Sequence, residues 1–210
     1  MSLGSVRREY RGKPLVEEAA ARDPFAQFAT WFEEARATEP DATAMTLATA
    51  TADGRPSARV VLLKGFDALG FVFFTNYESR KAGELESTQR AALLFYWPTF
   101  ERQVRIEGAV SRVPATESDA YFASRPLESR WSAIASPQSR EIDGRESLEA
   151  GVAGVRAAHG NTVPRPEYWG GYRVVPDAFE FWQGRENRLH DRLGYARAGD
   201  GAWHRRRLAP

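Results

Sequence analysis

Residues 188–192, near the C-terminal end of the chain, include two arginines, a histidine and an aspartate within five positions. If this segment is a strand, its side chains alternate between faces, and Arg188, His190 and Arg192 share one of them. Two guanidinium groups beside a titratable imidazole would hold and orient an anionic ligand. The alternative is a solvated edge strand, whose charges deter aggregation.

Two further segments have cations placed as phosphate groups require. Arg80 and Lys81 follow Ser79, where a helix is predicted to begin, so free backbone N–H groups and the helix dipole would add to the two side chains. Arg59 and Lys64 bracket an apolar strand and lie on opposite faces under strict alternation, so they meet one ligand only if Lys64 lies past the strand end or a bulge intervenes. Alternatively, both segments are solvated, with the side chains reaching into water.

Three residues suit a planar ring. Gln103, at the start of a predicted strand, could hydrogen-bond a heterocycle, and Trp182 and Tyr121 could stack on one. Aromatic residues at such spacings are more often part of a core.

Other chemistries lack the residues that they need. The chain has no cysteine, which excludes disulfides and thiol catalysis and is compatible with a cytoplasmic location. Its three histidines, His159, His190 and His204, lack metal-ligand spacing, so we expect no metal site. Dinucleotide, phosphate-loop and serine-elbow motifs are also missing from the sequence.

The overall charge and hydropathy argue against two classes of partner. A net charge of +1 over 210 residues does not favour a nucleic-acid partner held by bulk charge. No run is apolar and long enough to span a membrane, and the N-terminus lacks the apolar core of a signal peptide. We therefore expect a cytoplasmic protein that binds neither nucleic acid nor membrane.

The elements that must position these residues are mostly strands. A helix is predicted from Pro24, capped by Asp23, with Phe25, Phe28 and Phe32 on one face. Further helices are predicted at 79–87, capped by Ser79, at 116–125, opened by a capping box at 116–119, and at 147–158, whereas 127–143 has no clear pattern. Strands are predicted at 45–51, 57–66, 71–76, 91–96, 102–113, 172–175, 179–183, 190–196 and 203–208.

The connections between the strands are short, which predicts antiparallel pairing. Such a sheet best avoids exposed edges by closing into a barrel. We therefore expect an α+β fold, mainly β, with residues 1–22 as a mobile arm and residues 23–210 as a single domain. The run 205–207 is predicted to be a solvated terminal strand.

Motifs spread over nearly the whole chain carry a resemblance to a known family. They lie at 7–10 (RREY), 59–64 (RVVLLK), 74–76 with 79–81 (FTN, SRK), 101–104 (ERQV), 121–126 (YFASRP), 138–139 (QS), 169–173 (WGGYR), 179–184 (FEFWQG), 188–192 (RLHDR) and 207–210 (RLAP). In this order and spacing, the chain resembles the pyridoxine/pyridoxamine 5′-phosphate oxidases. One segment, 130–137, departs from the family pattern, although its length is kept.

The resemblance implies an antiparallel FMN-binding split β-barrel with flanking helices, and a homodimer with FMN at the interface. The FMN contacts that it implies are Arg59, Val60, Val61, Leu62, Leu63, Lys64, Phe74, Thr75, Arg80, Lys81, Gln103, Gln138, Ser139, Trp182 and Arg192. The substrate contacts that it implies are Lys64, Tyr121, Arg125, Ser129, Arg188, Leu189 and His190, with Arg7, Arg8, Glu9 and Tyr10 forming a lid over the substrate. Arg188 and His190 are the catalytic residues in this interpretation.

The implied reaction converts pyridoxamine or pyridoxine 5′-phosphate to pyridoxal 5′-phosphate. A hydride passes from the C4′ carbon to flavin N5, and O2 then reoxidises the flavin and yields H2O2. Two bound phosphates would explain why a nearly neutral chain has several local cationic clusters. Two alternatives are a related oxidase of another aromatic metabolite, of the phenazine-biosynthesis type, and a non-catalytic FMN-binding module.

Overall fold

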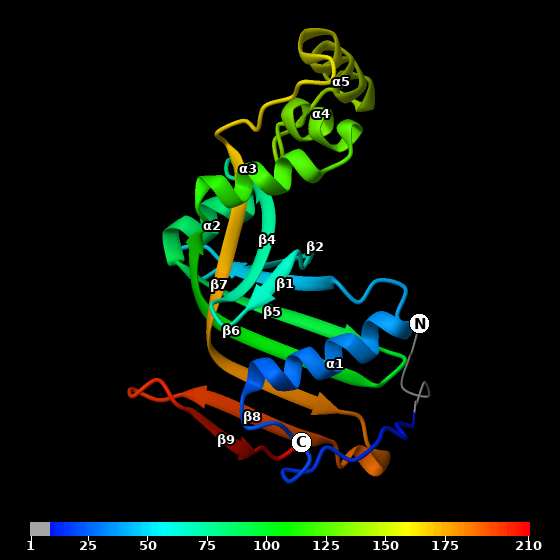
Figure 1. The fold of residues 1–210 in the computed structure, drawn as a ribbon, viewed down its shortest axis with the longest axis vertical. Helices are drawn as coiled ribbons and strands as arrows, with labels where there is room; N and C mark the ends of the chain where they lie inside the picture. Colours follow the sequence, from blue (N-terminus) through cyan, green and yellow to red (C-terminus); the bar gives the residue numbers. More distant parts are fainter. Residues whose placement is uncertain (1–8) are drawn as a thin grey trace.

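The computed structural model of the chain, which describes residues 9–210, is built on one antiparallel sheet (Figure 1). Its strands run in the order β2-β1-β5-β6-β7-β4-β3, with β8 added to β7 and β9 added to β8. Their bounds are β1 Ala44–Ala50, β2 Pro56–Leu62, β3 Gly65–Asp67, β4 Gly70–Asn76, β5 Arg90–Trp97, β6 Arg102–Arg112, β7 Trp169–Gln183, β8 Asp191–Arg197 and β9 Trp203–Arg207.

The sheet curls into a half-barrel because its path begins and ends with strands that are neighbours in sequence. Only Leu63 and Lys64 separate β2 from β3, and the Lys64 backbone N–H donates to Val72 of β4 at 2.8 Å. This closure, with helices around it, confirms the α+β split-barrel prediction.

The long strand β7 divides the barrel into two parts. One edge of β7 pairs with β6, whereas the other pairs with β4 over 169–174 and with β8 over 178–183. The β6–β7 register shifts between Glu107 and Gly108, where Asp177 is the extra residue of a β-bulge. The sequence analysis predicts two short strands here, at 172–175 and 179–183. The structure instead has one 15-residue strand, which continues past Pro176 because the bulge accommodates the proline.

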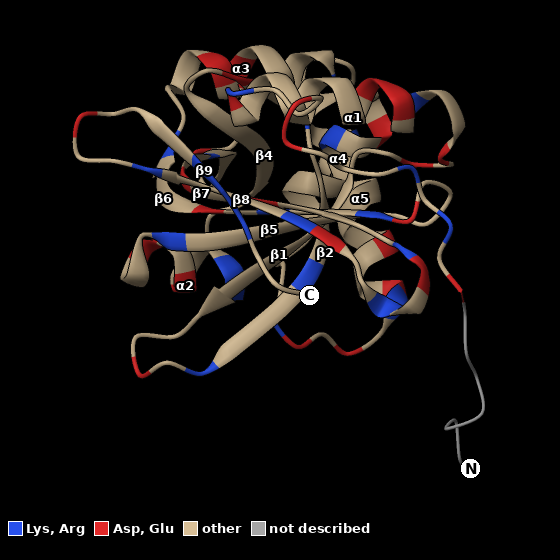
Figure 2. Ribbon diagram, turned by 90° about the horizontal axis from the view of Figure 1, so that it is seen from below, with Lys and Arg blue, Asp and Glu red and all other residues tan. Residues whose placement is uncertain are grey.

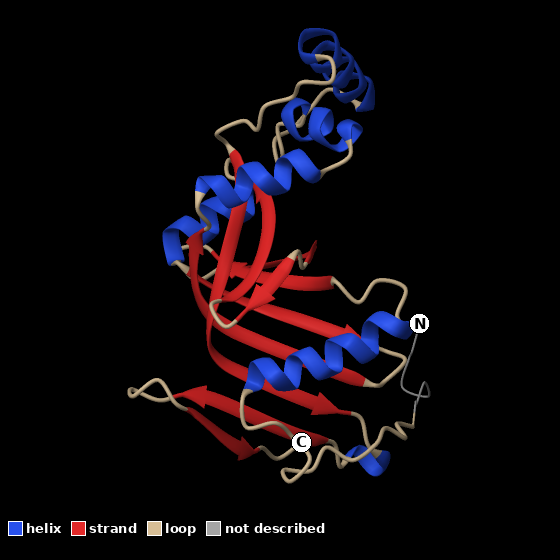
Figure 3. Ribbon diagram, viewed as in Figure 1, coloured by secondary structure: helices blue, strands red, loops and turns tan. Residues whose placement is uncertain are grey.

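The helices surround the sheet, several of them at one end and one along its length (Figure 3). They are α1 Pro24–Thr38, α2 Arg80–Thr88, α3 Ala115–Ser124, α4 Leu127–Ala135 and α5 Arg145–His159, with a 3-10 turn η1 at Glu186–Arg188. α1 lies along the sheet, whereas α3, α4 and α5 gather at the end of β7 where Trp169 begins (Figure 1).

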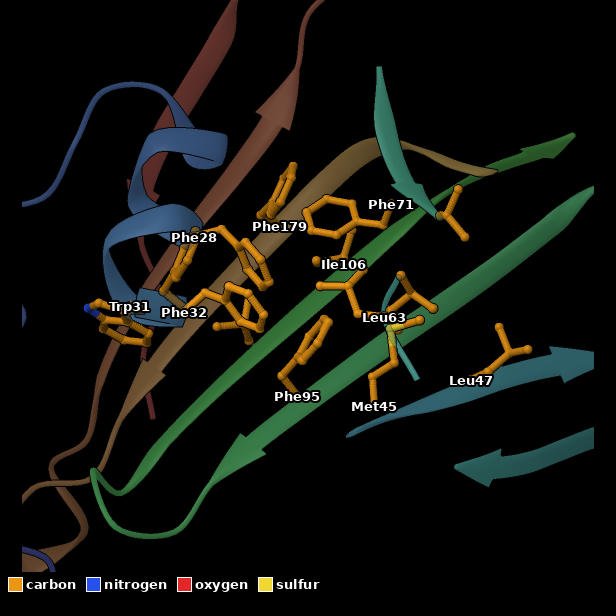
Figure 4. Close-up of a cluster of buried hydrophobic side chains, with 14 of the residues drawn as sticks. Phe28, Trp31, Phe32, Met45, Leu47, Leu63, Phe71, Phe95, Ile106 and Phe179 are labelled. Atoms are coloured by element: carbon orange, nitrogen blue, oxygen red, sulfur yellow. The ribbon is translucent and has the colours of Figure 1, made fainter. Parts of the chain in front are cut away.

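The main core fills the space between α1 and the barrel (Figure 4). Phe28 is fully buried and its ring lies 4.9 Å from those of Phe66 and Phe71 and 5.1 Å from that of Phe95. A second core cluster, around Trp169, joins α3 and α4 to the sheet. The aromatic residues of α1 therefore fix it to the barrel through edge-to-face contacts as well as burial.

The predicted helix starts are confirmed in part. Asp23 caps α1 through a 2.8 Å hydrogen bond from the Phe25 N–H, as expected. Ser79 stands at the N-cap of α2, but its hydroxyl donates to the Asn76 carbonyl instead. The capping box at 116–119 is wrong because α3 starts one residue earlier and Pro114 occupies its N-cap.

Residues 9–22 run along the far ends of β7, β8 and β9 without regular structure. Leu15 is buried, and the carbonyls of Ala20 and Ala21 accept hydrogen bonds from Arg205 and Tyr195. The predicted lid residues Arg7 and Arg8 lie outside the described residues. The run 205–207 is not simply solvated, since Arg205 and Arg207 both bind this segment.

Acidic and basic positions are interspersed along the ribbon (Figure 2). No helix among residues 9–210 has the length and apolar character needed to cross a membrane. Within the same residues, no group of His, Asp and Glu side chains is placed to hold a metal ion.

Candidate active site

A pocket of about 690 Å³ brings together most of the predicted phosphate-binding residues. Its lining comprises Arg59, Val60, Val61, Leu62, Lys64, Phe74, Thr75, Lys81, Tyr121, Arg125, Pro126, Ser129, Gln138 and Trp169. β2, β4, α2, α3 and α4 thus contribute to a single cavity. Among the described lining residues there are four cations and no carboxylate, so the pocket is suited to an anion.

Arg59 and Lys64 reach this pocket together because β2 ends at Leu62. Lys64 lies past the strand end, where alternation no longer applies. This is the first of the two arrangements that the sequence left open. Val60 and Leu62, on the outward face of β2, are 67% and 39% exposed, which gives the pocket an apolar wall.

A buried carboxylate fixes the pocket residue Arg59 from behind and also pairs with Arg80, which lies outside the pocket lining. Glu84 is 4% exposed and accepts hydrogen bonds from Thr49 Oγ1, Ser57 Oγ, Arg80 Nε and Arg59 Nη2 at 2.5, 2.6, 2.8 and 3.2 Å. Burial would raise the pKa of Glu84, but these hydrogen bonds outweigh it and lower the pKa to about 2. Glu84 therefore stays ionised and holds the guanidinium of Arg59 at the pocket wall.

Lys81 is the most perturbed cation of the pocket. Its ammonium group donates to Gln138 Oε1 at 2.7 Å and to Thr75 Oγ1 at 3.2 Å, which joins three predicted FMN contacts. Burial and then the charge of Arg59 lower the pKa of Lys81 to about 8. An anion placed here would relieve both effects.

Three stacked aromatic rings form one side of the pocket. The ring of Phe74 lies 4.0 Å from that of Tyr121 and 5.6 Å from that of Trp169, with interplanar angles of 20° and 12°. The guanidinium of Arg125 lies 4.8 Å from the Trp169 ring centre. Arg125 Nη1 is buried without a hydrogen-bond partner, and burial lowers the pKa of this residue. A buried cationic N–H that lacks an acceptor indicates that a ligand supplies one.

A second group of predicted residues meets at the other end of β7. Gln103, Trp182 and Arg192 are direct neighbours across β6, β7 and β8. The rings of Tyr10 and His190 lie 5.5 and 4.7 Å from that of Trp182, and 5.4 Å from each other. We call Tyr10, Trp182 and His190 the aromatic cluster.

The hydrogen bonds of His190 define its tautomer. Nδ1 accepts from the Arg185 backbone N–H at 3.1 Å, so the proton of the neutral ring resides on Nε2. Burial and then the nearby charge of Arg188 lower the pKa of His190. At neutral pH the ring is therefore uncharged and offers an Nε2–H donor.

The prediction that Arg188, His190 and Arg192 share one strand face is wrong. β8 begins only at Asp191, and Asn187 and Arg188 have φ angles of 55° and 61°. Two successive residues in the left-handed region turn the backbone, so strand alternation does not extend back to Arg188. Arg188 and Leu189 are exposed on a loop, and only Arg192 lies in the strand.

Several other predicted contacts lie outside the pocket lining. Leu63 is buried in the main core, Arg80 pairs with Glu84, and Ser139 is an exposed residue next to Gln138 with a φ angle of 73°. Arg192 makes two hydrogen bonds to the buried Glu180, at 2.9 and 3.0 Å. A ligand contact of Arg192 would have to share the guanidinium with Glu180.

Sequence reasoning missed Trp169 and Glu84. Trp169 belongs to the WGGYR motif but is not among the predicted contacts. Glu84 lies four residues after Arg80, and this ion-pair spacing within a helix was the available signal.

The pocket and the aromatic cluster lie at opposite ends of β7 (Figure 1). Trp169 lines the pocket and Trp182 belongs to the cluster, and 13 steps along a strand correspond to about 40 Å if the strand is straight. A flavin mononucleotide is much shorter than that. Within one chain, the pocket and the aromatic cluster therefore lie apart along β7.

Comparison with known proteins identifies related chains. Residues 32–159 match the family model described as pyridoxamine 5′-phosphate oxidase, and residues 169–210 match that of the pyridoxine 5′-phosphate oxidase C-terminal dimerisation region. The chain is 59% identical to pyridoxine/pyridoxamine 5′-phosphate oxidase from Rubrobacter xylanophilus, over 99% of this chain and 96% of that protein. It is 56% identical to the protein of the same name from Bordetella petrii, over the full length of both.

Solved structures agree with these matches. PhzG from Burkholderia lata 383, in complex with tetrahydrophenazine-1-carboxylic acid, superposes with a TM-score of 0.89 at 34% identity, covering 95% of this chain and 99% of that one. A pyridoxamine 5′-phosphate oxidase-related, FMN-binding protein from Nostoc punctiforme superposes with a TM-score of 0.74 at 17% identity, covering 90% and 100%, which shows a shared fold.

Proposed function

The chain belongs to the pyridoxine/pyridoxamine 5′-phosphate oxidase family, and from that premise we propose that it oxidises pyridoxamine or pyridoxine 5′-phosphate to pyridoxal 5′-phosphate with FMN as cofactor. The observation that carries this proposal is the pocket, where Arg59, Lys64, Lys81 and Arg125 meet without an opposing carboxylate among the described lining residues. A cofactor and a substrate that each bear a phosphate match four converging cations.

The residues present fit FMN. Arg59 and Lys81 would hold its phosphate, since Glu84 fixes Arg59 and Lys81 is held close by through Thr75 and Gln138. The apolar outward face of β2 would lie against the ring system. When bound, FMN would accept a hydride from C4′ while the alcohol or amine group loses a proton, and O2 would take up the electrons to give H2O2. With pyridoxamine 5′-phosphate the product of this oxidation is an imine, which water would hydrolyse to the aldehyde and ammonia.

The remaining pocket residues would hold the substrate. Arg125 offers an N–H without an acceptor, and Tyr121 and Ser129 add hydroxyl groups beside it. Lys64, exposed at the end of β2, adds a mobile positive charge. These residues would bind the 5′-phosphate and fix the distance between the pyridine ring and the flavin.

We place the aromatic cluster and Arg188 on the other side of the substrate. The neutral His190 would donate from Nε2 to a ring substituent, and Arg188 would add a positive charge on an exposed loop. Neither is a ready proton acceptor in this state, so their task would be orientation and polarisation.

These two groups would belong to one site only in a dimer. The match of residues 169–210 to a dimerisation region supports a contact between two copies through β7, β8 and β9. The pocket of one copy would then receive Gln103, Trp182, His190 and Arg192 from its partner. This arrangement supports the expected homodimer with FMN at the interface.

A visible absorption spectrum followed by a peroxide assay tests the proposal. The purified protein, reconstituted with FMN, is expected to be yellow and to release H2O2 with pyridoxamine 5′-phosphate or pyridoxine 5′-phosphate. A protein that FMN neither colours nor activates would refute it.

One observation favours a second candidate, an oxidase of another aromatic metabolite. PhzG was solved with tetrahydrophenazine-1-carboxylic acid and has nearly the same fold. A yellow protein that is idle with both vitamin B6 phosphates but oxidises a reduced phenazine would support that candidate. The identity to the vitamin B6 enzymes, 56–59% against 34%, favours the first.

Lys81 makes FMN binding dependent on pH. Its pKa in the free protein is about 8, so above that pH the side chain is neutral and must take up a proton when the phosphate binds. We expect the affinity of the apoprotein for FMN to be flat between about pH 6.5 and 7.5 and to fall by up to tenfold per unit above about pH 8. Flavin fluorescence quenching measures this directly.

The matched control is Lys81→Arg, which stays charged over the whole range. Its affinity is expected to change little between about pH 7 and 9.5. Equal slopes for the two proteins would show that Lys81 does not contact the phosphate.

A further inference from the structure

Arg207, at the end of β9, joins three segments that are far apart in sequence. Its Nε and Nη2 donate to the two carboxylate oxygens of Glu17 at 2.7 and 2.6 Å. Nη2 also donates to the Leu15 carbonyl at 2.9 Å, and Nη1 donates to Asp191 Oδ1 at 2.8 Å. The planar guanidinium therefore donates hydrogen bonds to the arm and to the first residue of β8 at the same time.

Asp191 completes the connection from the other side. Its second oxygen, Oδ2, accepts from the Leu15 backbone N–H at 3.1 Å and lies 3.9 Å from Arg185 Nε. Arg185 in turn donates from its backbone to His190 Nδ1, and from Nη1 to the Gly12 carbonyl at 3.3 Å. The loop that carries His190 is thus bonded to the arm at both of its ends.

The arm also packs directly on this loop. A Cβ at Gly184 would lie 2.7 Å from Tyr10 Cδ1, and one at Gly12 would lie 2.0 Å from Gln183 Nε2. The two backbones approach as closely as glycine allows. Any shift of the arm would therefore move the Tyr10 ring relative to Trp182 and His190.

The ion pair between Arg207 and Glu17 stays charged near neutral pH. The hydrogen bond from Arg207 lowers the pKa of Glu17 to about 2, and that with Glu17 raises the pKa of Arg207. The side chains of Arg207 and Glu17 remain 40% and 38% exposed. Ion pairs exposed to this extent add little to global stability, so their main effect is on local geometry.

We propose that Arg207 is a positioning residue, which locks the arm carrying Tyr10 to the loop carrying His190 so that both face the same substrate. The proposal rests on the function proposed above, which assigns these two residues to the substrate. Arg207 itself touches neither Tyr10 nor His190, and acts through Glu17, Leu15 and Asp191.

The test compares Arg207→Gln with Arg206→Gln in the FMN-loaded dimer. Arg206 is the neighbouring arginine on the same strand and is exposed, so its replacement removes the same charge without touching the arm. Two quantities are measured: the rate of tryptic cleavage after Arg11, and the steady-state constants with pyridoxine 5′-phosphate.

For Arg207→Gln we expect cleavage after Arg11 to be about tenfold faster, because proteolysis follows the population of the undocked arm. KM is expected to rise about tenfold and kcat to fall by less than about threefold, since ground-state positioning is what is lost. Adding Glu17→Gln to Arg207→Gln is expected to cause no further change beyond about twofold, because both act through one contact. Arg206→Gln is expected to behave as wild type in each measurement.

Cleavage and KM equal to those of Arg206→Gln would overturn the proposal. A lower melting temperature with an unchanged KM would also overturn it, because that result describes a purely structural contact. If the wild-type protein releases no peroxide with either vitamin B6 phosphate, the proposed function fails. The cleavage rates then still decide whether Arg207 holds the arm.

Discussion

Replacement of Arg125 by alanine is expected to lower kcat/KM for pyridoxine 5′-phosphate by about 100-fold or more, which corresponds to about 3 kcal/mol. Arg125 Nη1 is buried without an acceptor in the free protein, and we assign the substrate phosphate to it. Removal of this cation takes away a charge-assisted hydrogen bond in a partly desolvated pocket. FMN affinity is expected to change by less than about threefold, because other cations are assigned to the cofactor phosphate.

Stability should respond differently from activity. A buried guanidinium N–H without an acceptor costs free energy in the folded state, so Arg125→Ala is expected to leave the melting temperature of the ligand-free protein unchanged or to raise it by about 2 °C. Calorimetry measures this.

The control for Arg125 is Arg156→Ala. Arg156 lies over the ring of Trp131 at 5.3 Å, as Arg125 lies over Trp169, but it is on α5 and does not line the pocket. Its loss is expected to leave kcat/KM within about twofold of wild type. If Arg125→Ala also retained wild-type kcat/KM, the assignment of the substrate phosphate to this pocket would be wrong.

The second large effect concerns dimers built from two different chains. One chain carries Arg125→Ala, in the pocket, and the other carries Arg188→Ala with His190→Ala, in the loop. Each homodimer is expected to retain less than about 1% of wild-type kcat/KM, since every site lacks one half. The purified heterodimer is expected to recover about half of the wild-type activity, because one of its two sites is intact and the other carries all the changes.

The matched control places all three substitutions on one chain and pairs it with a wild-type chain. If each site combines the pocket of one copy with the loop of its partner, both sites of this heterodimer are damaged and activity stays near zero. If each site lies within one chain, the outcomes of the two heterodimers are exchanged. Co-expression with two different affinity tags supplies both proteins for a peroxide assay.

Local sequence patterns were sufficient to predict the elements that are stabilised by residues close together in the chain. The aromatic residues of α1 recur with helical spacing, and Asp23 with Pro24 marks its start, so the helix was predicted correctly from its first residue. The order of short strands with tight turns was sufficient to predict an antiparallel barrel. Within the pocket, residues 59–62 and Lys64 were predicted together through the family resemblance, because strand alternation alone placed Arg59 and Lys64 on opposite faces.

The errors arose where distant segments override a local pattern. The local pattern predicted separate strands at 172–175 and 179–183, but pairing with β6 on one edge and with β4 and β8 on the other holds β7 continuous through a bulge. Alternation predicted a strand through Arg188, but the left-handed backbone of Asn187 and Arg188 turns the chain before β8 begins. Neither the register of a strand nor the sign of a residue's φ angle can be predicted from one segment alone.

The sequence by itself determined the chemistry of this protein: several cationic segments, aromatic rings and a lone histidine in an arginine-rich loop, in an order that identifies the family. Tertiary structure alone decided which of them act together. Lys81, Gln138 and Arg125 meet because α2, α3 and α4 converge on one end of β7, whereas His190 and Trp182 lie at its other end. Such groupings depend on contacts between residues far apart in the chain, and the free energy of those contacts has no local signature in the sequence.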